Sequence, residues 1–423
     1  MIDVAVQREI STCSPTLYPT MDPPHIPPEI WRNIFRFATF TATSLNMMDW
    51  GPYWPYARLV DVHPTKSYHS TLPTKKAITL VSRHFRELSL EYLFEVVQLF
   101  HTHNAQLLLY AILSHATVTG TPSSPARWIK YMTVDLDTNE DSHLMDGVLM
   151  KIFPRCENLV AFGWESHERL LDFQTDDSSE LMASIPLNIT TLEWHRNVLG
   201  HSFNSLRGHV ALRNLRVSDV LSMSPADCDV TIPSITHLDA RTPLTSIAVS
   251  WWDLPSVVHL TLDCLDGHHF ERLVSKSRDT IESIYIPDPW RCRLDGFPRI
   301  LASMPKLRTF YYDIDVNTDD QDKLSSTWIH VGAHASLTHV YLFCRTGMHY
   351  GKGSFSAVRD LFLGHLQPLL DRHLPLTIAI MGAQSVFEQG DFREDGYDSA
   401  AQERFFYDLS ASLNISQVRI TVQ

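Results

Sequence analysis

Three hexapeptides in the middle of the chain share one pattern of apolar and polar residues: LRNLRV at 212–217, ITHLDA at 235–240 and VVHLTL at 257–262. Their first, fourth and sixth positions are apolar, and their third and fifth positions are polar. Because successive side chains of a β-strand point to opposite faces, this alternation predicts short strands with one buried face. The regular spacing predicts one strand in each unit of a repeat.

The same pattern continues in both directions along the chain. It occurs at 159–164, 189–194, 281–286, 307–312 and 337–342. The central apolar residues of these eight segments are 22 to 30 residues apart. WIKYMTVDL at 128–136 is predicted to be an earlier strand, and ISQVRI at 415–420 the last one. Such a period is typical of leucine-rich repeats, in which each unit supplies one strand of a curved parallel sheet.

Residues 99–423 therefore resemble a divergent leucine-rich-repeat domain. The predicted fold class is α/β, with a curved solenoid and a parallel sheet. The asparagine that normally follows the strand in this family is missing from most units, so the turns must be held in another way. Residues 355–423 alternate helical and strand patterns and are predicted to cap the array. The alternative is an ordinary α/β domain whose strands happen to be evenly spaced.

The third and fifth positions of the template are predicted to form two columns on the concave, solvent-facing side of the sheet. The first column is Thr191, Asn214, His237, His259, Ser283, Thr309 and His339. The second column is Glu193, Arg216, Asp239, Thr261, Tyr285, Tyr311 and Tyr341. Tyrosines are frequent anchors of protein interfaces. We therefore predict that a target protein binds here, through Glu193, Arg216, Asp239, Tyr285, Tyr311 and Tyr341. The alternative is that the tyrosines only pack against one another.

The N-terminal region carries helical patterns instead. HIPPEIWRNIFRFATF at 25–40 places Pro28 at a first helical position, where its missing N–H has no partner to lose. One apolar face contains Ile30, Ile34 and Phe37, and a neighbouring face contains Trp31, Phe35 and Ala38. A second helix is predicted from Thr74 as its cap through Tyr92. The segment EYLFEVVQL at 91–99 is predicted to be a third short helix that runs into an extended segment. Such a small bundle needs a neighbour to cover its apolar surface.

Two segments of this region resemble the F-box. IPPEI at 26–30 with IF at 34–35 is similar to its first helix, and LVSRHFREL at 80–88 is similar to its second signature. With YLFE at 92–95, the pattern is close to the F-box-like proteins abundant in mushroom-forming fungi. Phe85 and Ser82 stand where the family usually has Trp and Cys. The resemblance covers roughly residues 25–98.

This resemblance implies docking on a Skp-type adaptor and, through it, on a cullin-based ubiquitin ligase. The adaptor contacts that it implies are Pro27, Pro28, Ile30, Ile34, Val81, Phe85 and Leu88. Residues 41–73 form an insertion that the family usually lacks, and docking would fail if this insertion folded across the adaptor face. The predicted organisation is a flexible N-terminus (1–24), the F-box-like module (25–98) and the repeat domain (99–423).

Composition and motifs exclude several functional classes. The formal net charge of −13 offers no footprint for nucleic acid or for an anionic membrane surface. The N-terminal sequence lacks a signal-peptide pattern, no stretch is long enough to span a bilayer, and the six cysteines are scattered. We expect a cytoplasmic or nuclear protein. No nucleophile elbow, phosphate-binding loop or zinc motif is found, so we expect no enzyme activity, no metal and no cofactor.

These observations predict a substrate-recognition subunit of a Skp–cullin–F-box type ubiquitin ligase. One alternative is a repeat scaffold that binds proteins without any ligase, its front helices serving only as a cap. Exposure of Ile30 and Ile34 distinguishes the two. A second alternative is an enzyme of unknown class, which would show a deep pocket with converging titratable groups.

Overall fold

The computed structural model describes part of the chain with defined placement. The described residues are 26–39, 64–118, 124–136, 142–166, 178–221, 229–240, 242–262, 267–287, 297–315, 334–345, 361–366, 376–382, 404, 407 and 418–422. The predicted flexible N-terminus and residues 41–63 of the insertion lie outside them.

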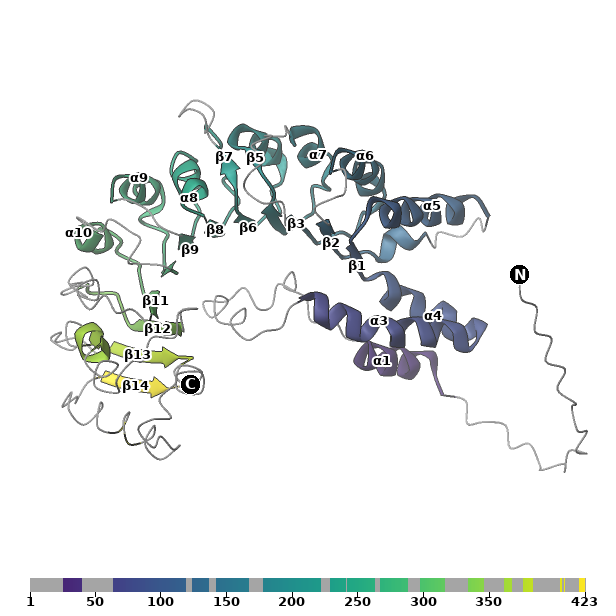
Figure 1. The fold of residues 1–423 in the computed structure, drawn as a ribbon, viewed down its shortest axis with the longest axis horizontal. Helices are drawn as coiled ribbons and strands as arrows, with labels where there is room; N and C mark the ends of the chain where they lie inside the picture. The colour runs from purple at the N-terminus through teal and green to yellow at the C-terminus, as the bar shows by residue number, and fades with distance from the viewer. Residues whose placement is uncertain are drawn as a thin grey trace, which may run out of the picture.

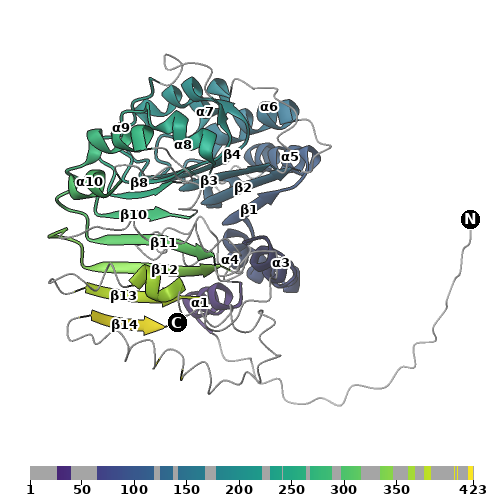
Figure 2. The ribbon, with the colours of Figure 1, turned by 60° about the vertical axis from the view of Figure 1, so that its left-hand side comes forward.

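Twelve strands in the described part of the chain form one sheet, in which every neighbouring pair is parallel. The strands are β1 (Val96–Leu99), β2 (Tyr131–Leu136), β3 (Ala161–Ser166), β4 (Thr191–His195), β6 (Asn214–Val217), β8 (His237–Ala240), β9 (His259–Leu262), β10 (Ser283–Ile286), β11 (Thr309–Asp315), β12 (His339–Arg345), β13 (Leu376–Met381) and β14 (Val418–Val422). Their order in the sheet is their order in the chain. The sheet curves into an arc (Figure 1), and Figure 2 shows its strands running in one direction. A second, separate sheet pairs β5 (Val198–Leu199) with β7 (Val220–Leu221).

Helices cover the outer, convex side of this arc (Figure 1). They are α5 (Thr102–Val118), η2 (Pro125–Trp128), α6 (Ser142–Ile152), η3 (Phe153–Arg155), α7 (Ser179–Ser184), η4 (Gly200–Gly208), α8 (Pro243–Val249), α9 (Gly267–Ser277) and α10 (Phe297–Ala302). The main apolar core lies between this layer and the sheet, and it includes the fourth-position residues of the predicted strands, such as Leu192, Leu215 and Leu238. The predicted curved parallel-sheet solenoid is therefore confirmed.

The strand register also agrees with the predicted columns. Thr191 lies opposite Asn214, which lies opposite His237, and the pairing continues through the first column to His339. The second column pairs in the same way from Glu193 to Tyr341. The last strand is shifted by two residues from the predicted template, because Arg419 lies opposite Thr377. A shift of two residues keeps each side chain on its predicted face.

The turns that enter the strands are tied together by a ladder of polar side chains. Each donor lies three residues before the first paired residue of its strand, and each bonds a main-chain carbonyl of the preceding turn. The bonds are Asn158 to Arg127 O (2.6 Å), Asn188 to Glu157 O (2.8 Å), Ser234 to His209 O (3.1 Å), Thr280 to Pro255 O (3.3 Å) and Ser336 to Pro305 O. This ladder ties neighbouring turns together in place of the missing repeat asparagine. It lies before each strand, whereas the asparagine of the family follows the strand.

The N-terminal helices are α1 (Pro28–Ala38), α3 (Pro64–Val81) and α4 (Arg83–Phe94). The predicted single helix from Thr74 through Tyr92 is wrong, because the chain breaks at Ser82. This residue is extended, and its hydroxyl accepts a hydrogen bond from the Phe85 N–H at 3.1 Å, so it caps a new helix. The last part of the predicted insertion, 64–73, is helical and belongs to α3. The segment 91–99 is helical up to Phe94, as the end of α4 and not as a separate third helix, and its predicted extended part is β1.

Candidate functional site

The N-terminal helices pack around a small aromatic core of their own. Phe35 from α1 and Leu88 and Tyr92 from α4 are buried, and Trp31 and Phe85 pack against them. The ring of Phe85 lies 4.6 Å from that of Trp31 and 5.1 Å from that of Phe35, measured between centroids. Trp31 and Phe35 of this predicted stripe therefore form the inner face of α1, whereas its third member, Ala38, is exposed.

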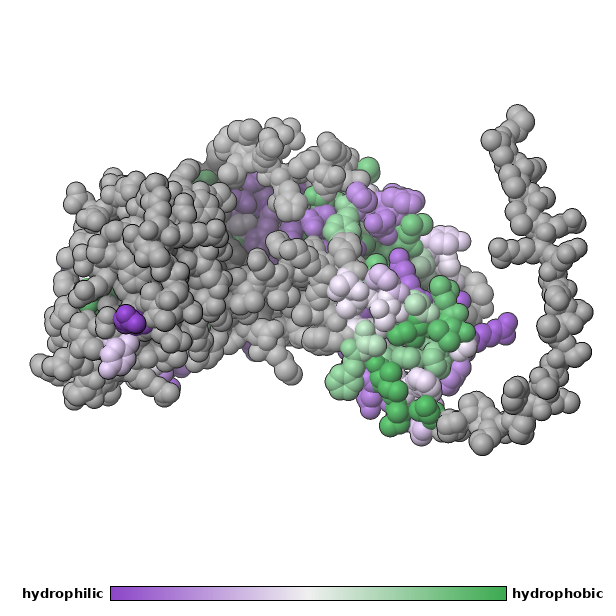
Figure 3. Space-filling view, turned by 60° about the horizontal axis from the view of Figure 1, so that its bottom comes forward, coloured by the Kyte–Doolittle hydropathy of each residue, from purple (hydrophilic) through white to green (hydrophobic). Residues whose placement is uncertain are grey.

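The second apolar face of these helices is open. Ile30, Ile34 and Phe37 on α1 are 48%, 44% and 86% exposed, and Leu80 and Val81 at the end of α3 are 82% and 65% exposed. We call these five residues the bare face. Figure 3 shows the apolar side chains gathered over this part of the molecule. Large aliphatic and aromatic groups exposed in this way make the bare face a candidate interaction site.

The seven residues that the F-box resemblance implied are distributed between these two faces. Pro27, Ile30, Ile34 and Val81 are exposed, and Pro28 and Phe85 are half-buried. Leu88 is only 7% exposed, because it packs against Phe35 and Tyr92 inside the module. Leu88 therefore lies in the aromatic core and not on an exposed face, while its role as a direct adaptor contact stays a prediction. Phe85 contributes mainly to the same core.

Burial also tunes two ionisable groups near this core. Desolvation raises the pKa of Tyr92 to about 12, and the phenol donates a hydrogen bond to the Arg32 carbonyl at 3.0 Å. Desolvation likewise lowers the pKa of the buried Lys75 ammonium, while the Glu95 carboxylate opposes that shift. Glu95 in turn accepts a hydrogen bond from the Lys130 ammonium at 2.7 Å. The Tyr92 hydrogen bond connects α4 to α1, and the Glu95–Lys130 pair connects the end of α4 to the start of β2.

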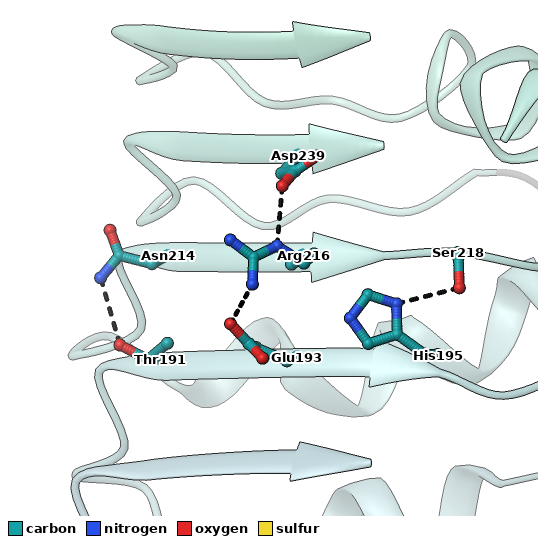
Figure 4. Close-up of polar contacts among 7 residues, drawn as sticks. All are labelled: Thr191, Glu193, His195, Asn214, Arg216, Ser218 and Asp239. Carbon is teal, nitrogen blue, oxygen red and sulfur yellow. Dashed lines mark hydrogen bonds and ion pairs between the residues drawn. The ribbon is translucent and has the colours of Figure 1, made fainter. Parts of the chain in front are cut away.

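The concave side of the sheet is less exposed to solvent than predicted, since Thr191, Asn214 and Ser283 of the first column are buried, as are several members of the second column. Arg216 donates from Nε to Asp239 Oδ2 at 2.7 Å and from Nη1 to the Glu193 carboxylate, across three adjacent strands (Figure 4). All three side chains are buried, with exposed fractions of 0% for Glu193 and Arg216 and 2% for Asp239. The predicted solvent-facing charges instead form an internal ion-pair triad, because opposite charges on neighbouring strands pair laterally.

The predicted tyrosine ladder is present and is also buried. Tyr311 stacks on Tyr341 at a centroid distance of 4.7 Å and meets the Tyr285 ring edge-on at 6.3 Å. Phe343, Ala379 and Met381 complete this second apolar cluster, and the exposed fractions of the three tyrosines are between 2% and 7%. The expected open tyrosine face is therefore wrong. Their packing with one another, the alternative in the sequence analysis, is what the structure shows.

The first concave column contains a stacked pair of histidines. The rings of His237 and His259 are 4.3 Å apart, and His259 Nδ1 lies 2.6 Å from Ser283 Oγ. Desolvation lowers the pKa of His259, and Glu282 opposes the shift. No group of three or more His, Cys, Asp or Glu side chains in the described ranges is arranged to hold a metal ion.

The structure identifies exposed and ion-paired residues that were not among the predicted site residues. Phe37 and Leu80 are the most exposed members of the bare face. Phe37 was recognisable from its i, i+7 spacing to Ile30, whereas the exposure of Leu80 depends on the chain break at Ser82. Arg196 is buried at the end of β4, where it binds both Asp146 oxygens at 2.9 and 3.0 Å. No local pattern marked that long-range pair.

Among the helices of the described ranges, none combines the length and the apolar character needed to cross a bilayer. No family model matches the sequence. No curated protein matches it either. Among solved structures, the leucine-rich repeat-containing protein LegL7 from Legionella pneumophila is similar, with a TM-score of 0.41 and 11% sequence identity over 77% of this chain and 90% of that chain. The solenoid described above rests on the strand register of this chain itself.

Proposed function

We propose that this chain is the substrate-recognition subunit of a Skp–cullin–F-box type ubiquitin ligase. The bare face of α1 and α3 binds the Skp-type adaptor, and the solenoid binds a target protein. The observation that carries the proposal is the exposure of Ile30 and Ile34, because a mere cap of the solenoid would have no reason to leave its second apolar face open. The F-box resemblance, close to the type found in mushroom-forming fungi, points to the same face.

The charge around the bare face favours a protein partner with an acidic surface. The described residues 26–39 and 64–94 contain seven Lys and Arg residues, of which Lys75 is buried, and three Glu residues, in a chain whose net charge is −13. Arg36, Lys76 and Arg83 are exposed beside the apolar residues. Complementary charge at the rim of an apolar interface raises the association rate and excludes wrong partners.

On this proposal the chain performs no chemistry itself. It holds a target near the ubiquitin-transferring enzyme and raises the local concentration of acceptor lysines, so its contribution to catalysis is proximity. The second candidate function is a repeat scaffold that binds proteins without any ligase. The solenoid is compatible with both functions, because protein binding by the repeats does not require the N-terminal helices.

Co-purification of the full chain with a Skp-type adaptor tests the proposal. The test variant is Ile34→Asp with Val81→Asp, since both side chains are exposed and the aromatic core stays intact. Phe85 is not suited to this test, because a charge there would disrupt the packing with Trp31 and Phe35. The matched control is Leu144→Asp, which adds a charge at a 58% exposed leucine of α6.

We expect the wild type and the control to retain the adaptor and the folded double variant to lose it. Circular dichroism verifies the fold of each protein. If the wild type fails to bind the adaptor, or if the double variant binds it as well as the wild type does, the ligase proposal is wrong and the scaffold function takes its place.

A further inference from the structure

The turns at one edge of the solenoid carry an apolar row that neither the core nor the bare face uses. Leu187, Val210, Pro233 and Pro255 each lie four residues before the first paired residue of β4, β6, β8 and β9, respectively. They therefore occupy one equivalent position in four consecutive repeats. All four are exposed, with fractions of 64% for Leu187 and 75% for Val210. We call this row the turn-edge stripe.

The spacing of the stripe fits a helix better than a strand. Adjacent strands, and so adjacent members of the stripe, are about 4.8 Å apart. An α-helix repeats its same-face side chains about every 5.4 Å, whereas an extended strand repeats them about every 6.6 Å. An amphipathic helix of about three turns that lies along the stripe can therefore place one apolar side chain beside each repeat.

The net charge of this edge indicates the charge of the residues that flank the apolar face of the partner. The seven residues that precede the first paired residue of each strand from β2 to β11 together contain nine Lys and Arg residues and four Asp and Glu residues. Arg207 and Arg213 are exposed in the same turn as Val210. Four of these cations, Arg127, Arg155, Arg207 and Lys276, lie in the last turns of outer helices, where they also offset the helix dipole. The edge is thus net positive in a chain of net charge −13.

We propose that the turn-edge stripe binds an amphipathic helix with acidic flanks, presented by a target protein. This inference deepens the target-binding half of the proposed function and is independent of adaptor binding. It places target recognition at the edge of the solenoid, since the tyrosines and the charged triad of the concave columns are buried. The ladder of Asn188 and Ser234, whose side chains bond the preceding turns, holds the stripe in a fixed geometry.

Fluorescence anisotropy with the full chain tests this inference. The probe is a labelled synthetic helical peptide with leucines at alternating spacings of three and four and glutamates on both sides, and the comparison peptide has lysines in place of the glutamates. The test variants are Leu187→Ser with Val210→Ser, and Arg207→Glu. The matched control is Leu244→Ser, which removes a 56% exposed leucine of α8 away from the stripe.

We expect the acidic peptide to bind at least about tenfold more tightly than the basic one, and each test variant to weaken that binding by about tenfold. Leu244→Ser should leave it unchanged. Equal affinity for both peptides, or unchanged binding by the Leu187→Ser and Val210→Ser variant, overturns the inference. Neither result depends on the adaptor. A chain that retains the adaptor but does not bind the acidic peptide would therefore refute the inference about the turn-edge stripe and leave adaptor binding unaffected.

Discussion

The Arg216 Nε atom lies 2.7 Å from Asp239 Oδ2 on the next strand, while Nη1 of the same guanidinium contacts Glu193 on the strand before. Two carboxylates and one guanidinium are thus buried together on the concave side of the sheet. Charges that are withdrawn from water are tolerated only while each retains its partner, because desolvation costs several kcal/mol per ion. Removal of one member of this triad is therefore costly, because it leaves an uncompensated buried charge.

Replacement of the central cation should destabilise the protein. We expect Arg216→Met to lower the free energy of unfolding by about 3 to 5 kcal/mol, because two buried carboxylates lose their partner. Urea denaturation followed by circular dichroism measures the change. The triple variant Glu193→Leu, Arg216→Met and Asp239→Leu should recover much of the loss. An Arg216→Met protein as stable as the wild type would contradict the buried triad.

The tyrosine cluster makes a separate prediction about stability. Tyr311→Ala should cost about 3 to 5 kcal/mol, since it leaves a cavity between Tyr285 and Tyr341. Tyr285→Phe should cost about 1 kcal/mol, because Asp313 Oδ1 loses the phenol donor that lies 2.8 Å away. Thermal unfolding compares the variants. A Tyr311→Ala protein with unchanged stability would show that the ring is not packed as described.

The polar ladder of the turns should contribute measurably to stability. Asn188 donates from one amide nitrogen to the Glu157 carbonyl at 2.8 Å and to the Leu159 carbonyl at 3.3 Å. We expect Asn188→Ala to destabilise the protein by about 1 to 2 kcal/mol, as the preceding turn loses its tie. Asn204→Ala on the exposed side of η4 is the control and should change the unfolding midpoint little. Equal effects of the two substitutions would argue against the ladder.

Acid sensitivity should arise from a histidine near the C-terminal strands. His365 is 5% exposed, with Nδ1 3.4 Å from the Tyr312 hydroxyl, and burial lowers its pKa to about 4. In the unfolded chain this histidine has an ordinary pKa of about 6.5. Between pH 6.5 and about 4 the unfolded chain therefore binds more protons than the folded chain does. The contribution of His365 to stability is complete above about pH 6.5 and is lost as the pH falls toward about 4. We expect a loss of about 2 kcal/mol between pH 7.5 and 5.

Replacement of that ring isolates its contribution. His365→Phe keeps an aromatic ring beside Tyr312 and should flatten the pH dependence of the urea midpoint between pH 7.5 and 5. His103→Phe, at an exposed position of α5, should leave the slope as it is in the wild type. A slope that persists in His365→Phe would assign the acid sensitivity to other groups.

The first turn of α4 is capped by the Ser82 side chain. Ser82→Ala should lower stability by about 1 kcal/mol, because the Phe85 N–H loses its side-chain acceptor at the start of α4. Ser82→Asp should retain the cap and most of the stability. The variants are compared by thermal unfolding and by the adaptor co-purification described above. If Ser82→Asp were as unstable as Ser82→Ala, capping would not be the cause.

Much of the architecture could be predicted from local patterns. The alternation in LRNLRV and its relatives predicted the strands, and their spacing predicted the register from Thr191 to His339. The split of α1 into two apolar faces was also visible in the positions of Ile30 and Trp31. The break at Ser82 was missed, because helical periodicity continues across it and only the turn to α4 shows that the serine caps a new helix.

The sequence by itself determined the α/β repeat and the faces of its strands, because side-chain alternation along a strand is a local property. Only the tertiary structure decided which polar residues face water. Glu193, Arg216 and Tyr311 look like surface residues one strand at a time, and they become buried because neighbouring strands supply opposite charges and aromatic partners at about 4.8 Å. The same stacking aligns Leu187 with Val210, and so creates an apolar edge from residues far apart in the chain.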